Sequence, residues 1–166
     1  MAVLVTAASK HGATAEIGAA IARHLESLGV PSEFRAPREV FQLDAYDGIV
    51  LGSAVYAGRW LADGREFAWS WSAELRARPV WLFSSGPIGN PPEPDESVDV
   101  ADVLEVTKAR EHRLFGGRLD RSLLGFGERA MVRAVGAKEG DFRNWNEIAA
   151  WSTGIAEAMK DVSVRL

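Results

Sequence analysis

Cysteine is absent from this chain of 166 residues, and histidine is scarce. Without a thiol, the chain can form no disulfide, bind no metal through thiolates and use no cysteine nucleophile. The three histidines, His11, His24 and His112, lie far apart in the sequence and show no metal-ligand spacing. We therefore expect neither a metal site nor thiolate catalysis.

The chain also lacks an excess of basic residues and long apolar runs. Its formal net charge is −4 and its isoelectric point is about 5.4, which argues against nucleic acid as the main partner. No stretch approaches the roughly 18 apolar residues of a membrane span, and no basic segment precedes the first apolar run, so neither a transmembrane segment nor a signal peptide is expected. With 47% hydrophobic residues, residues 1–166 are predicted to form a single globular domain in the cytoplasm. Nothing in the sequence indicates an oligomeric state.

Predicted strands and helices alternate along most of the chain. Short apolar runs predict strands over residues 2–7, 31–35, 47–53, 79–83 and 111–115, and helical spacing predicts helices over residues 13–28, 60–75 and 97–109. This alternation implies right-handed crossovers and an α/β fold of three layers, with a doubly wound, five-stranded parallel sheet. The tail departs from the alternation. There we expect an extra helix over residues 119–135, capped near Asp120, before a final helix from Asn144 to Met159.

The loop after the first predicted strand has the composition of a phosphate cradle. It leads directly into a helix and reads Ser9-Lys10-His11-Gly12-Ala13-Thr14. The free N–H groups and the macrodipole at a helix N-terminus favour an anion, and the hydroxyls of Ser9 and Thr14 can donate hydrogen bonds to it. Lys10 adds positive charge, and Gly12 allows a close approach of the backbone. An ordinary turn between a strand and a helix also favours serine and glycine, and it stays open as the alternative for this loop alone.

Two further loops should open on the same edge of the sheet. In a doubly wound sheet, ligands bind outside the carboxyl ends of the strands, where the strand order reverses. The loops after the third and fourth predicted strands read Ser53-Ala54-Val55-Tyr56-Ala57-Gly58 and Ser84-Ser85-Gly86-Pro87-Ile88-Gly89. Their small and hydroxyl residues expose backbone amides, while Tyr56 and Trp60 offer flat surfaces, so the three loops together suit a phosphorylated ring system. Core packing is the alternative for both aromatic side chains.

Three other classes of α/β protein are excluded because the chain lacks residues that they need. A low-molecular-weight tyrosine phosphatase needs a cysteine in its phosphate loop, and a receiver domain needs an aspartate where the third strand ends at Ser53. A dinucleotide-binding domain needs several spaced glycines after the first strand, where Gly12 stands alone.

The three loops together resemble those of the flavodoxin-like superfamily. The cradle is similar to the flavodoxin phosphate loop, with His11 where threonine is common, and Gly52-Ser53 begins a loop similar to the one that surrounds the flavin ring. Residues 115–120 and 140–145 resemble the flavodoxin-domain branch that includes menaquinone-dependent protoporphyrinogen oxidase. The resemblance implies the flavodoxin-like strand order 2-1-3-4-5.

The resemblance also implies non-covalent FMN as the cofactor. Residues 9–14 would hold its phosphate, and residues 53–58 and 84–89 would flank the ribityl chain and the isoalloxazine ring. The flavin would carry the chemistry, so no catalytic side chain is expected. The implied function is an FMN-dependent oxidoreductase with a small-molecule electron donor or acceptor, such as a quinone or protoporphyrinogen. An electron-carrier flavodoxin and a flavinless interaction module on the same scaffold stay open as alternatives.

Overall fold

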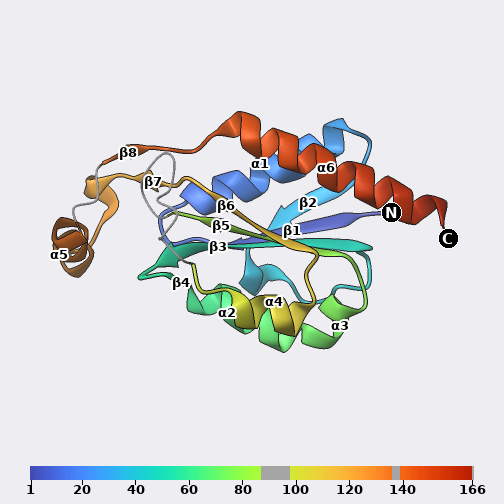
Figure 1. Cartoon of the computed structure of the whole chain (residues 1–166), viewed down its shortest axis with the longest axis horizontal. Coiled ribbons are helices and arrows are strands. Elements are labelled where there is room, and N and C mark those ends of the chain that lie inside the picture. Colours follow the sequence, from blue (N-terminus) through green and yellow to red (C-terminus); the bar gives the residue numbers. More distant parts are fainter. Residues whose placement is uncertain (87–97, 136–138, 166) are drawn as a thin grey trace.

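The computed structural model describes residues 1–86, 98–135 and 139–165 and has a parallel sheet at its centre (Figure 1). The strands are β1 (Val3–Ala8), β2 (Ser32–Arg35), β3 (Gly48–Tyr56), β5 (Val80–Ser85) and β6 (Glu111–Phe115), in the order β2-β1-β3-β5-β6. Every side chain of β1 and β5 is buried, as expected for central parallel strands that helices cover on both faces. Apart from the short strand β4, this is the predicted order 2-1-3-4-5, so the predicted fold class is confirmed.

Helices cover both faces of the sheet and make the three predicted layers (Figure 1). One face carries α1 (Ala13–Ser27) and α6 (Trp145–Val164), and the other carries α2 (Ala62–Ser70), α3 (Ser72–Arg76) and α4 (Ala101–Thr107), while the 3₁₀ helix η1 (Pro37–Glu39) connects β2 to β3. Each face has its own apolar core. Successive side chains of β5 alternate between the two cores: Leu82 belongs to one and Phe83 to the other.

β3 extends beyond the predicted strand and ends in a hairpin. We expected the strand to stop at Ser53, but it continues to Tyr56 and pairs with the antiparallel strand β4 (Arg59–Trp60). Ala57 and Gly58 form the turn, with φ angles of 49° and 75°. Positive φ at both central positions is typical of a two-residue type I′ hairpin. The first central position of such a turn usually carries asparagine or aspartate, whereas alanine rarely adopts positive φ. Because Ala57 stands there, no signal in the sequence predicted the turn.

The helix predicted over residues 60–75 is divided in two. Trp60 belongs to β4, and α2 begins at Ala62. Trp71, with φ −104° and ψ 17°, ends α2 and precedes α3. The apolar spacing continues through this break because Phe67 and Leu75 pack into the same core. The spacing therefore predicted one helix where the backbone forms two.

The tail contains an extra helix, as predicted, but the helix does not extend over all of residues 119–135. Arg118–Leu119 form β7, which pairs with β8 (Gly140–Asp141), and Arg121–Leu123 form the 3₁₀ helix η2. Asp120 accepts hydrogen bonds from Ser122 and so precedes η2 instead of capping an α-helix. The extra helix, α5 (Phe126–Val135), lies beyond the end of the sheet (Figure 1). Pairing between distant segments overrides the local helical spacing here.

Asn144 caps the start of α6, as predicted. Its Oδ1 accepts hydrogen bonds from the backbone N–H groups of Asn146 and Glu147, the pattern of an N-cap. The helix ends at Val164 instead of Met159. Among the helices of the described residues, none is both long and apolar enough to cross a membrane.

Candidate functional site

The carboxyl ends of β1, β3 and β5 meet at one edge of the sheet, as predicted. Ala8 is paired with Ser53, and Ser53 is paired with Ser84, so three loops leave the sheet side by side. The described parts of the predicted loops therefore converge. Three residues of the third loop lie outside the described residues: Pro87, Ile88 and Gly89.

The loop between β1 and α1 leaves the start of the helix without a side-chain cap from the described residues. Gly12 is the N-cap residue and has a φ angle of 89°, a left-handed conformation that suits glycine. Its N–H donates to Ser9 Oγ at 3.1 Å, which closes the loop on itself. Thr14 is buried in the first turn. An uncapped first turn stabilises an anion through its free amides and the helix dipole.

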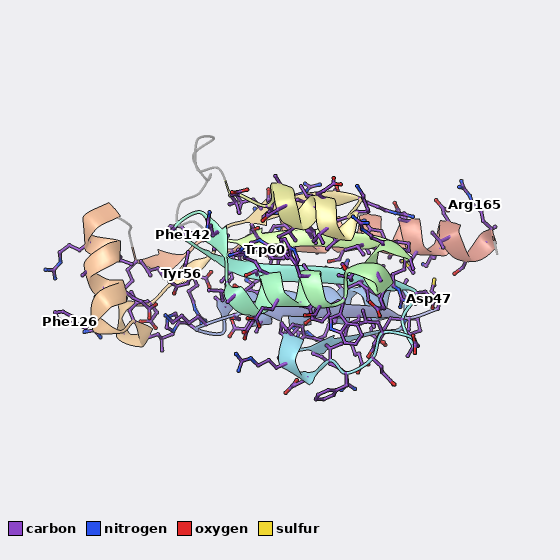
Figure 2. All side chains as sticks on the ribbon, turned by 90° about the horizontal axis from the view of Figure 1, so that it is seen from below. Asp47, Tyr56, Trp60, Phe126, Phe142 and Arg165 are labelled. Atoms are coloured by element: carbon purple, nitrogen blue, oxygen red, sulfur yellow. The ribbon has the colours of Figure 1, made fainter. Side chains whose placement is uncertain are left out.

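Three side chains at this edge converge on a carboxylate that the sequence pattern did not predict. Glu128, on α5, accepts a hydrogen bond from Tyr56 OH at 2.8 Å. The same carboxylate lies 2.9 Å from Lys10 Nζ and 2.8 Å from His11 Nε2. Figure 2 shows Tyr56 at the end of the sheet that faces α5. We call Lys10, His11 and Tyr56 the donor set.

The donor set surrounds an ionised group. Hydrogen bonds from His11 and then Lys10 lower the pKa of Glu128 to about 2, so this carboxylate is charged at neutral pH. Burial, and then the hydrogen bond to Glu128, raise the pKa of Tyr56, so its hydroxyl stays protonated and can donate. Lys10 Nζ also lies 5.3 Å from the centre of the Tyr56 ring, a cation–π distance. The arrangement can therefore bind one anionic group.

Two arginines from the tail form ion pairs beside the first loop. Arg143, whose side chain is 5% exposed, pairs with Glu16 and Asp141 and donates to Ala13 O at 3.4 Å. Arg118 also pairs with Glu16, at 3.4 Å. Hydrogen bonds from Arg143 lower the pKa values of both Glu16 and Asp141. These ion pairs hold β7 and β8 against the start of α1, a contact between distant segments for which no local pattern exists.

The second loop uses its hydroxyl group to shape the hairpin. Ser53 is fully buried. Its Oγ donates to Ala54 O at 2.8 Å and accepts from Leu61 N–H at 3.0 Å. Val55 packs partly against the core, and the turn is exposed at Ala57. The groups that this loop can present to a ligand are therefore its backbone and the Tyr56 ring.

The third loop begins in a buried chain of hydrogen bonds. Ser84 Oγ accepts from Trp60 Nε1 at 2.8 Å and lies 2.6 Å from His112 Nε2. Ser84 is fully buried and Trp60 is 4% exposed. Trp60 therefore packs in the core, which was the alternative to contact with a ligand. Burial lowers the pKa of His112. Ser85 is also buried, and Gly86 leaves the sheet with a φ angle of 90°.

Comparisons with known proteins connect the chain to one family. Residues 4–145 match the family model described as the flavodoxin domain, whereas no curated protein matched the chain. Among solved structures, the chain is similar to a flavodoxin from the domain Archaea, with a TM-score of 0.65 and 19% identity over 96% of this chain and 99% of that one.

Two larger proteins contain a similar fold. Rubredoxin oxygen:oxidoreductase from Desulfovibrio gigas has a TM-score of 0.64 and 11% identity over 96% of this chain and 36% of that one. A flavone reductase has a TM-score of 0.62 and 10% identity over 98% of this chain and 64% of that one. At these identities the solved structures show the shared fold alone, while the family match extends over most of the chain. The chain therefore belongs to the flavodoxin-domain family.

Proposed function

We propose that residues 1–166 form one FMN-binding domain that works as an FMN-dependent oxidoreductase. The observation that carries this proposal is the placement of Lys10 and His11, which hold an anionic group beside the uncapped start of α1. The phosphate of FMN is such a group, and free amides of a first helical turn are the donors it needs. The residues present at this edge thus fit the cofactor.

Each loop has a separate role in this proposal. Residues 9–14 bind the phosphate, and residues 53–58 and 84–89 flank the ribityl chain and the ring. When bound, FMN supplies the redox chemistry, while the protein binds and orients it. We expect Ser53 and Ser84 to support the loops from inside the protein, because both hydroxyls are already hydrogen-bonded there. Tyr56 is the side chain of the second loop that we expect against the ring or over its edge.

Titration with FMN, FAD and riboflavin tests the proposal through the quenching of flavin fluorescence. We expect FMN to bind most tightly. Thr14→Ala should weaken FMN roughly ten- to a hundredfold, the equivalent of one hydrogen bond to a charged group, and should leave riboflavin almost unchanged. Riboflavin serves as the matched control because it lacks only the phosphate. If riboflavin bound as tightly as FMN, the cradle would not be a phosphate site.

We further propose a small, quinone-like partner. The turn at Ala57 and Gly58 carries no bulky side chain, which favours access of a planar substrate to the adjacent ring. Two electrons and two protons would pass to the quinone, and protoporphyrinogen is the electron donor that the sequence resemblance suggests. Location in the cytoplasm stays a prediction.

The partner can be tested with the FMN-loaded, chemically reduced protein. We expect it to reduce a menaquinone analogue without any protein partner, and Tyr56→Ala to change this rate more than it changes the free energy of unfolding. Electron transfer only to or from another protein would favour the electron-carrier flavodoxin. Failure to bind any flavin would favour an interaction module on the same scaffold.

A further inference from the structure

The hydrogen bonds and ion pairs of Glu128 link α5 to the site. None of the described side chains of this helix is fully buried, and Phe126 is 93% exposed and points away from the sheet (Figure 2). Glu128 instead reaches the donor set, and its side chain is 16% exposed. The contacts of Glu128 therefore help to hold α5 at the edge of the sheet.

The carboxylate of Glu128 occupies the donor set as a separate anionic ligand would. A lysine ammonium, an imidazole and a phenol all donate hydrogen bonds to carboxylates and phosphates alike. Here Lys10 and Tyr56 contact this carboxylate at 2.9 Å and 2.8 Å. Lys10 and His11 belong to the loop to which the proposed function assigns the phosphate of the cofactor. An imidazole N–H donates to one acceptor at a time, and two anions on one loop repel each other.

We propose that Glu128 is an internal competitor for the phosphate of the cofactor, so that phosphate binding releases α5 from the sheet edge. This inference rests on the proposed function, because it assigns a second occupant to the same loop. Before the cofactor binds, Lys10 and His11 hold Glu128, and α5 is docked beside Tyr56. When a phosphate monoester takes these donors, Glu128 and α5 leave together, and the Tyr56 hydroxyl is freed.

Glu128→Gln tests the competition because it removes the charge and keeps the shape of the side chain. Glu157→Gln is the matched control, since Glu157 is an exposed carboxylate on α6. The affinity for FMN and for riboflavin is measured by fluorescence titration. We expect Glu128→Gln to bind FMN about tenfold more tightly than the wild type, a change of about 1.4 kcal/mol, and riboflavin with unchanged affinity. Glu157→Gln should match the wild type for both ligands.

Hydrogen exchange of the amides of residues 126–135 provides a readout that does not depend on flavin. These amides should exchange faster in Glu128→Gln without any ligand, and faster in the wild type when FMN or inorganic phosphate is added. FMN binding that is weaker in Glu128→Gln, or equal to that of the wild type, would overturn the competition.

Equal exchange of α5 in the wild type and in Glu128→Gln would overturn it as well. If the wild type binds no flavin, the proposed function fails by itself. In that case the exchange measurements with inorganic phosphate still decide whether Glu128 and a phosphate compete. No effect of phosphate on α5 would then refute the inference.

Discussion

Ser84→Ala should destabilise the protein, because Ser84 connects two polar side chains from other strands. Its Oγ accepts the hydrogen of Trp60 Nε1 at 2.8 Å, and an indole N–H can only donate. We therefore assign the hydroxyl hydrogen of Ser84 to His112 Nε2, 2.6 Å away, which makes His112 neutral and protonated on Nδ1. The alanine variant leaves both the indole N–H and the imidazole nitrogen without this partner.

The expected loss of stability follows from burial. Ser84 is fully buried and Trp60 is 4% exposed, so water cannot replace the hydroxyl without entering the core. A buried polar group that loses its partner costs about 1–3 kcal/mol, and His112 is only partly buried. We expect the free energy of unfolding to fall by about 2–3 kcal/mol for the two groups together. In a chain of this length the Tm should fall by roughly 2–4 °C for each kcal/mol.

The same contact predicts how stability depends on pH. Burial lowers the pKa of His112 below its usual value of 6.5, so the unfolded chain binds this proton more tightly than the folded protein does. The free energy of unfolding is therefore unaffected by the titration of His112 above pH 6.5, and it decreases as the pH falls below this value. Ser84→Ala lacks the hydrogen that opposes protonation of Nε2. Its stability should decrease less over the same interval.

Urea unfolding at about pH 8 and about pH 5 measures both effects. Ser152→Ala is the matched control: Ser152 is also fully buried, but its Oγ donates to the helical carbonyl of Ile148 at 2.8 Å. That carbonyl can keep a helical hydrogen bond, so the control should lose less than about 1 kcal/mol. The reasoning is refuted if Ser84→Ala is as stable as Ser152→Ala, or if Ser84→Ala keeps the pH dependence of the wild type.

Gly52→Ala should lower the free energy of unfolding by about 1–3 kcal/mol in urea, because a Cβ would lie 2.2 Å from the buried ring of Phe83. By contrast, Gly154→Ala in α6 should raise the free energy of unfolding by about 0.5–1 kcal/mol, because a Cβ there meets nothing within 4 Å. Equal changes in the two alanine variants would contradict the packing argument. Arg143→Met should detach β8 from α1 and speed amide exchange in β8, because the Arg143 side chain is 5% exposed and pairs with two carboxylates. Unchanged amide exchange in β8 would contradict this role. Because hydrogen bonds lower the pKa of Glu128 from 4.5 to about 2, its contribution to docking should be complete above pH 4.5 and decrease steadily as the pH falls from there to about 2. A carboxyl NMR signal that titrates near 4.5 would refute the contact.

Local patterns were sufficient for the sheet and for the position of the loops. Apolar runs such as the one that contains β1 mark strands buried on both faces, and the helices between them leave few arrangements of a parallel sheet. Prediction failed where a distant partner decides the conformation. Residues 118–119 became a strand because residues 140–141 pair with them, and β3 extended because it pairs with β4. Helical or apolar spacing carries no information about such partners.

The amino-acid sequence by itself therefore determined the α/β fold and the edge of the sheet where the loops after β1, β3 and β5 meet, while the strand order was implied by the resemblance to the flavodoxin-like superfamily. The fold class and this edge follow from the periodicity of neighbouring residues and from the handedness of the crossovers. Only the tertiary structure decided what the side chains at that edge contact. Glu128 lies 117 residues from His11 and 72 residues from Tyr56 in the chain, and it meets them because β7 and β8 place α5 beyond the end of the sheet. A hydrogen bond between such distant positions depends on where the packed elements bring the two atoms, and no spacing within the sequence records that.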